Sequence, residues 1–149
     1  MNAEIRALDP NTLWNKFADL NAVPRPSKKE ERVIAFIKDF GESLGLVTEI
    51  DKVVVMQSHL DMVHQKNADT DFNFDTQGIE MYVDGDWVRA RGTTLGADNG
   101  LGVATIMAIL ESKDIEHPAI EALFTIDEET GMTGAKGLEG GWLKGDILL

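Results

Sequence analysis

Val53-Val54-Val55-Met56-Gln57-Ser58 is an apolar run without strict alternation of polar residues, and His59-Leu60-Asp61 follows it directly. This pattern predicts a β-strand covered on both faces, as is typical of an α/β sheet. His59 and Asp61 lie two positions apart, so on an extended backbone their side chains point to the same side. The carboxylate can then hold the imidazole in one tautomer, which suits a zinc ligand. An ordinary polar strand end is the alternative, because so short a motif often occurs by chance.

Helical patterns lie on both sides of this strand. Apolar residues at helical spacing predict three helices, over Leu13 to Leu20, Val33 to Leu44 and Leu101 to Leu110. Asp9-Pro10 is typical of a helix start, and Ser27-x-x-Glu30 has the form of a capping box before the second helix.

Further segments have the composition of strands. Leu46 to Ile50 and Ala119 to Ile126 are apolar, whereas Glu80 to Val83 and Trp87 to Ala90 flank Asp84-Gly85-Asp86 and predict a hairpin toward a sheet edge. The alternation of strands and helices predicts an α/β fold with three layers, α/β/α. We expect its functional loops at the carboxyl ends of the strands.

The composition excludes several classes of protein. At 149 residues the chain is long enough for one domain with a core, and its 26 acidic against 14 basic residues give a net charge of −12. This charge opposes binding to nucleic acid and to membrane surfaces. There is no cysteine, so disulfides and thiolate ligands are excluded. Without a signal-peptide pattern or a membrane-length apolar run, we expect a cytoplasmic location.

Acidic residues occur at two more boundaries of apolar segments. Asp98 precedes the third helix, where a carboxylate could bridge two cations or simply cap the helix. Asp127-Glu128-Glu129 directly follows a predicted strand, and three adjacent acids repel one another unless cations or solvent compensate. A solvated charge run is one interpretation. In the other, one glutamate binds metal while its neighbour handles a proton, and the three segments form a metallohydrolase site.

Three long motifs resemble those of the M20 metallopeptidases and occur in the same order. They are Ser58-His59-Leu60-Asp61-Met62-Val63, Gly96-Ala97-Asp98-Asn99-Gly100-Leu101-Gly102 and Ile126-Asp127-Glu128-Glu129-Thr130-Gly131-Met132-Thr133-Gly134-Ala135. The resemblance implies a zinc-peptidase type of catalytic domain, with residues 1–149 as its N-terminal part. It also implies metal-dependent hydrolysis of dipeptides.

The resemblance implies a role for each candidate site residue. His59 is expected to be a terminal metal ligand, with Asp61 as its hydrogen-bonded partner. Asp98 would bridge two metals, Glu129 would bind the second metal, and Glu128 would be the general base. The implied cofactors are two divalent ions, with zinc favoured and manganese or cobalt acceptable. Similar enzymes also have a cis peptide bond after the bridging aspartate, here Asp98-Asn99.

The chain departs from the family pattern in its extent. The family's lid and dimerisation domain and its remaining metal ligands are not found here, and Asp51-Lys52 alone joins two predicted strands where a longer insertion is expected. We therefore expect this chain alone to be inactive, and a full-length relative to form a homodimer. Two alternatives stay open. One is another M20 amidohydrolase, such as an N-acyl amino acid deacylase, and the other is a non-catalytic metal-binding fragment.

Overall fold

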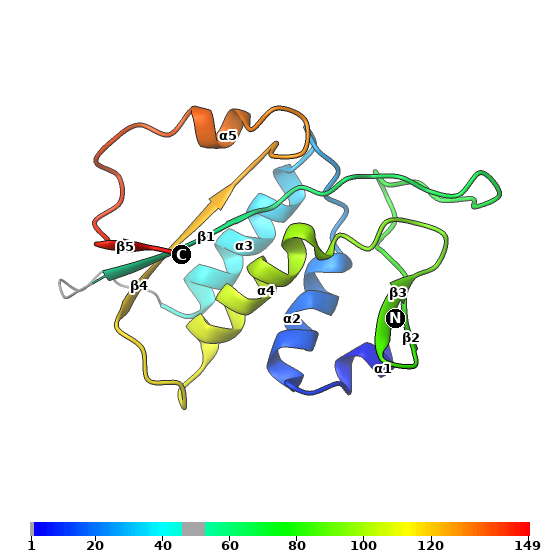
Figure 1. The fold of residues 1–149 in the computed structure, drawn as a ribbon, viewed down its shortest axis with the longest axis horizontal. Coiled ribbons are helices and arrows are strands. Elements are labelled where there is room, and N and C mark those ends of the chain that lie inside the picture. Colours follow the sequence, from blue (N-terminus) through cyan, green and yellow to red (C-terminus); the bar gives the residue numbers. More distant parts are fainter. Residues whose placement is uncertain (1, 46–52) are drawn as a thin grey trace.

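A parallel sheet with helices packed against it forms the centre of the computed structural model, which describes residues 2–45 and 53–149 (Figure 1). The helices are α1 (Ala3–Arg6), α2 (Asn11–Asn21), α3 (Glu31–Ser43), α4 (Ala97–Glu111) and α5 (Thr133–Lys136). The strands are β1 (Val53–His59), β2 (Met81–Asp84), β3 (Trp87–Ala90), β4 (Ala119–Thr125) and β5 (Ile147–Leu148). None of the helices in these residues is both long and apolar enough to cross a bilayer.

The main sheet has the strand order β4-β1-β5, and both pairings are parallel. β1 and β4 pair in register from Val53 opposite Ala119 to His59 opposite Thr125. The apolar run that predicted a central strand therefore forms one. Because the two strands end together, the loops that follow His59 and Thr125 leave the sheet at the same edge.

The three long helices α2, α3 and α4 lie on one side of the strands, and the short α5 lies on the other (Figure 1). The core between the helices and the sheet contains buried apolar side chains from α2, α3 and α4 and from the residue that follows β1: Leu20, Val33, Val103, Met107 and Leu60. The predicted α/β class with a parallel sheet is confirmed. Among the described residues, the second helical layer is represented by α5 alone.

The predicted hairpin forms, but its position differs from the prediction. β2 and β3 pair with each other as a separate two-stranded sheet rather than at the edge of the main sheet. The reason is burial, since Ile79 and Met81 pack with Ile5 and Phe17 in a second apolar cluster. The Asn2 side chain strengthens this contact, because its Oδ1 accepts a hydrogen bond of 3.0 Å from the Met81 N–H.

The three predicted helices are present, and their first residues can be compared with the predicted start signals. The first begins after a cis Asp9-Pro10 peptide, with Pro10 at the N-cap position. The predicted capping box is wrong, because α3 has Glu30 at its N-cap without a side-chain cap, and Ser27 and Glu30 bond to the site loops instead. The predicted strand over Leu46 to Ile50 lies outside the described residues. Helices α1 and α5 were not predicted.

Candidate active site

The predicted site residues lie together at the carboxyl edge of the main sheet. His59 is the last residue of β1, and Glu128 and Glu129 follow shortly after β4. Asp98 lies in the first turn of α4, which packs against β1. Three segments that are distant in sequence thus meet where the parallel register brings the strand ends together.

The His59 ring is the centre of this group. Its Nε2 lies 3.1 Å from Asp98 Oδ1 and 3.8 Å from Glu128 Oε2. One ligand atom each of His59, Glu128 and Glu129 can be chosen so that all lie within 4.8 Å of one another. His59 is buried, whereas the Asp98 side chain is 87% exposed. The site is therefore a buried imidazole whose Nε2 faces carboxylates at an open rim.

Asp61 holds the His59 ring from behind. The ring Nδ1 lies 3.1 Å from the Asp61 backbone carbonyl and 3.4 Å from its Oδ1. Asp61 thus faces Nδ1, and Nε2 is the ring nitrogen that faces the Asp98 carboxylate, where it can bind a cation when the ring proton is on Nδ1. The two residues lie side by side as predicted, but the hydrogen bond at Nδ1 is to the Asp61 backbone carbonyl and the carboxylate lies farther away.

The Asp61 carboxylate also binds the loop that carries the glutamates. It is fully buried and accepts hydrogen bonds from the N–H groups of Glu128 (3.0 Å) and Glu129 (3.2 Å) and from the Ser27 hydroxyl (2.7 Å). Burial by itself would raise the pKa of Asp61, but these hydrogen bonds and the His59 ring outweigh it and hold the pKa below its usual value. One carboxylate therefore fixes both the imidazole and the two adjacent acids.

The backbone around Asp98 turns its carboxylate toward His59. Asp98 and Asn99 have non-helical φ and ψ angles within α4, and the peptide bond between them is cis, as the family resemblance implied. The N-cap of α4 is Gly96, and Asp98 makes no capping hydrogen bond. The Asn99 carbonyl accepts a hydrogen bond of 3.2 Å from Ser58 Oγ, which ties this turn to β1. Simple helix capping by Asp98 is therefore not what the structure contains.

The three adjacent acids after β4 separate into two groups. Asp127 is buried with a positive φ of 55°, and its carboxylate accepts hydrogen bonds from the hydroxyls of Thr130 and Thr133. Those two hydrogen bonds hold the pKa of Asp127 below its usual value. Glu128 and Glu129 remain partly exposed at the rim. The crowding is relieved because Asp127 turns inward, and the run is more than a solvated charge patch.

Glu30, Asp61 and Asp127 form a second group of acids, and all three are buried. Each of the three carboxylates already accepts hydrogen bonds. Glu30 Oε1 accepts from the N–H groups of Lys28 (2.9 Å) and Asp127 (3.1 Å), and the other two carboxylates accept the bonds described above. This group is a structural frame for the loops. The sequence pattern did not reveal it, because Ser27-x-x-Glu30 has the spacing of a capping box.

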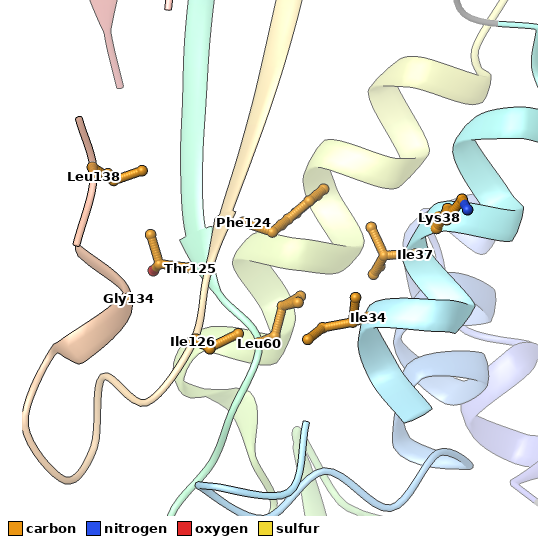
Figure 2. Close-up of a pocket in the computed structure, with 9 residues that line it drawn as sticks. All are labelled: Ile34, Ile37, Lys38, Leu60, Phe124, Thr125, Ile126, Gly134 and Leu138. Carbon is orange, nitrogen blue, oxygen red and sulfur yellow. The ribbon is translucent and has the colours of Figure 1, made fainter. Parts of the chain in front are cut away.

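An apolar pocket lies beside the site but is separate from it. Figure 2 shows it between α3 and the strand ends, where Ile34 and Ile37 face Leu60 and Phe124 across a cavity of about 410 Å³. None of the five predicted site residues lines it. The polar group around His59 is therefore at the open rim of the sheet, whereas this pocket is part of the packing between helix and sheet.

The residues at the rim suit divalent metal ions. Imidazole nitrogen and carboxylate oxygen are ligands that zinc accepts, and the partner of Nδ1 orients the ring as metal-binding histidines require. Asp98, Glu128 and Glu129 supply carboxylates on the side of Nε2. The chemistry and placement of the side chains thus fit a metal site. Exposed His64 and His117, which were expected to be surface residues, lie on the surface.

Comparison with known proteins gives a consistent result. The cytosol non-specific dipeptidase of Escherichia coli is 42% identical over 165 residues, in a match that covers 99% of this chain and 34% of the relative. The crystal structure of aminoacylhistidine dipeptidase from Vibrio alginolyticus has a TM-score of 0.93 and 48% identity, over 98% of this chain and 34% of that one. A tripeptidase structure from Staphylococcus aureus, at 23% identity and a TM-score of 0.74 over 95% of this chain and 43% of its own, supports the fold alone.

The extent of these matches matters for their interpretation. The chain spans about a third of the length of the Escherichia coli and Vibrio alginolyticus relatives. The alignment with the former spans 165 residues against 149 in this chain, so the relative has residues without a counterpart here. The model of peptidase family M20/M25/M40 matches residues 55–148, which is more than half of the chain and includes all five predicted site residues. The chain belongs to peptidase family M20/M25/M40.

Proposed function

We propose that residues 1–149 are the N-terminal part of the catalytic domain of a metal-dependent dipeptidase. His59 and Glu129 are proposed as terminal metal ligands, Asp98 as the carboxylate shared by two ions, and Glu128 as the general base. Asp61 orients His59. The observation that carries the proposal is the convergence of His59, Asp98 and the two glutamates at one edge of the sheet.

The side chains divide the chemistry among themselves. A pair of divalent ions held there would polarise the scissile carbonyl and lower the pKa of a water. Glu128 stands at the rim with its Oε2 on the side of His59 Nε2, where it can take a proton from the attacking water. The same carboxyl can then deliver this proton to the leaving amine. Asp61 holds the Glu128 backbone N–H and so fixes where the base stands.

The finer features of the proposal come from the relatives and from the ligand types. The substrate is an unblocked dipeptide, because the two most similar relatives described above are named as dipeptidases. Mixed nitrogen and oxygen ligands favour zinc, and they also accept manganese or cobalt. A cytoplasmic location follows the name of the Escherichia coli relative, and a homodimer is proposed for the full-length protein. The lid domain is proposed to lie outside residues 1–149.

The test uses two proteins, the 149-residue chain and a hybrid enzyme. Metal binding is measured on the 149-residue chain by elemental analysis after dialysis against zinc, manganese or cobalt. Hydrolysis is measured on a hybrid in which this chain replaces the matched third of the Escherichia coli dipeptidase, because the hybrid restores the remaining parts of that enzyme. Substrates are unblocked dipeptides and N-acetylated amino acids. Glu139→Gln, at an exposed position away from the site, is the matched control.

The proposal predicts metal binding that depends on His59, Asp98 and Glu129, and dipeptide hydrolysis that depends on Glu128. Preferential cleavage of N-acetylated amino acids would support an amidohydrolase instead. A folded hybrid that binds metal without any turnover would support a non-catalytic metal-binding protein. Activity of the chain alone would contradict the expectation that this segment needs the rest of the enzyme.

A further inference from the structure

Arg25 is a buried cation that the proposed chemistry leaves without a role. Only 2% of its surface is exposed, although arginine is rarely buried in a protein unless its charge is compensated. Burial lowers the pKa of Arg25 to about 10, against the opposing effect of the Asp61 charge. The group is therefore still protonated at neutral pH. A buried guanidinium is costly, and the Nε of Arg25 has no hydrogen-bond partner among the described residues, so the bonds of Nη1 and Nη2 must account for its place in the structure.

The Arg25 guanidinium joins the two loops that carry His59 and Asp98. Its Nη1 donates a hydrogen bond of 3.1 Å to the carbonyl of Leu60, the residue between His59 and Asp61. Its Nη2 donates a hydrogen bond of 3.1 Å to the carbonyl of Gly96, two residues before Asp98. These two bonds come from one planar group, so they set the separation of the two backbones with little freedom.

Neighbouring side chains lock the guanidinium in this position. Asn21 Oδ1 accepts a hydrogen bond of 2.8 Å from Arg25 Nη2, and Asn21 Nδ2 donates one of 3.3 Å to the Leu95 carbonyl. The Gly96 carbonyl also accepts the N–H of Gly100 at 3.1 Å, within the first turn of α4. The arginine therefore contacts the loop at the point where the helix begins.

The glycines of this loop leave the space that the guanidinium fills. A Cβ atom at Gly96 would lie 2.9 Å from Arg25 Nη2, and a Cβ atom at Gly100 would lie 2.7 Å from the same nitrogen. Gly96 also has a φ of 71°, which disfavours any other residue. The Gly96 to Gly100 segment is thus shaped around the guanidinium as well as around the metal site.

We infer that Arg25 is a positioning residue that sets the distance between His59 and Asp98, and thereby tunes the affinity of the site for a divalent cation. The inference rests on the proposed function, since it assigns a role in the same site. Arg25 touches neither substrate nor metal in this scheme. It acts through the Leu60 and Gly96 carbonyls, which lie next to the two ligand-bearing positions.

The test uses the 149-residue chain with cobalt(II) as the probe. The visible absorption of bound cobalt reports both affinity and coordination geometry. Arg25→Ala should weaken cobalt binding about 10- to 100-fold, as loss of groups that orient ligands commonly does. Millimolar guanidinium chloride should restore most of the affinity and the wild-type spectrum by entering the space left by the side chain, whereas ammonium chloride should not. Arg25→Lys should give an intermediate loss because an ammonium lacks the planar fork.

Ile5→Ala is the structural control, because Ile5 is fully buried in α1 and belongs to the apolar cluster under the hairpin. It should lower stability while leaving cobalt affinity of the folded chain unchanged. Equal weakening by Ile5→Ala and Arg25→Ala, or failure of guanidinium to restore binding, would overturn the inference. If Arg25→Ala does not fold, Arg25→Lys becomes the test of the inference. Wild-type cobalt affinity and a wild-type spectrum in Arg25→Lys would overturn the inference.

A metal-free measurement separates this inference from the proposed function. The His59 ring and the amides of Gly96 and Gly100 are followed by NMR in wild type and in the Arg25 variants. Their signals should move in the variants and return with guanidinium. If the hybrid enzyme, which restores the remaining parts of the relative, binds no cobalt, the metal site of the proposed function fails. Unmoved signals in the Arg25 variants would refute the positioning role.

Discussion

The carboxyl edge of the sheet and the segment from Gly137 to Leu149 differ in which side chains they bury and which they expose to solvent. At the carboxyl edge, polar side chains such as Arg25, Asp61 and Asp127 are buried and hydrogen-bonded. In the C-terminal segment, large apolar side chains are exposed: Trp142 by 68%, Ile147 by 54%, Leu148 by 65% and Leu149 by 72%. In these two regions, therefore, polar side chains are buried where they are hydrogen-bonded, and apolar side chains are left exposed in the C-terminal segment.

The two regions are also held by different groups. The C-terminal segment is attached mainly through its backbone, since Asp146 N–H donates to the Val53 carbonyl and Leu149 N–H to the Val55 carbonyl, both at 2.9 Å. The frame at the carboxyl edge uses side chains that each serve several loops. We therefore expect single substitutions to be severe at the carboxyl edge and mild in the C-terminal segment.

The largest effect is expected at Glu128 in the hybrid enzyme. Glu128→Gln should lower kcat about 10²- to 10⁴-fold, because the amide keeps the shape but cannot take a proton. Its metal content should stay near that of wild type. Glu129→Gln should instead lose metal. Elemental analysis and steady-state kinetics measure both quantities, and equal metal loss in the two variants would show that the roles have been divided wrongly.

Removal of the Asp61 carboxylate should have the largest effect on stability. Asp61→Ala leaves the Ser27 hydroxyl and the N–H groups of Glu128 and Glu129 without their acceptor in a buried place. Each unsatisfied buried group costs about 1–3 kcal/mol, so the free energy of unfolding should fall by at least about 2 kcal/mol. The free energy of unfolding of Asp61→Asn should lie between those of wild type and Asp61→Ala, because the amide has one oxygen that can accept hydrogen bonds where the carboxylate has two. Urea unfolding measures these free energies. A smaller loss in Asp61→Ala than in Ser27→Ala would contradict the role of Asp61 as the shared acceptor of the loops.

The pH dependence of stability tests the same carboxylate in another way. The folded pKa of Asp61 is lowered, so its stabilising contribution is fully present above the unfolded pKa of about 3.9 and is lost as the pH falls through the folded value. The free energy of unfolding should therefore decrease with acidification below about pH 4. Asp61→Asn should flatten this dependence, whereas Asp69→Asn, at an exposed position, should leave it unchanged. The lowered pKa of Asp127 should leave part of the dependence in place, and a dependence that is undiminished in Asp61→Asn would contradict the contribution of Asp61.

The sequence predicted the elements around the site because each has its own periodic or apolar pattern. β1, β4 and the three long helices appear where those patterns lie, and His59, Asp98 and Glu128 converge at the ends of the parallel strands. The hairpin was placed wrongly because its partner is a cluster with α1, which the pattern of the hairpin itself does not reveal.

The frame was missed for a related physical reason. Ser27 and Glu30 have the spacing of a local cap, and only the folded chain brings Asp61 and the Asp127 N–H within their reach. Arg25 gave no signal either, since it stands between Pro24 and Pro26 in a segment without periodicity. Side chains that act between distant segments are not encoded in any short pattern, and these were the ones that the sequence did not show.

The smallest effect is expected in the C-terminal segment. Leu148→Ser removes an apolar side chain that is 65% exposed, and it leaves the backbone pairing of β5 with β1 intact. The free energy of unfolding of the chain should change by no more than about 0.5 kcal/mol, as for most exposed positions. Val55→Ser, in the strand that β5 pairs with, is the matched control, because Val55 is 2% exposed and should cost several times more. Urea unfolding measures both losses in the free energy of unfolding. Similar losses in the two variants would mean that Leu148 is covered in solution, and the C-terminal segment would then differ less from the carboxyl edge than its exposure indicates.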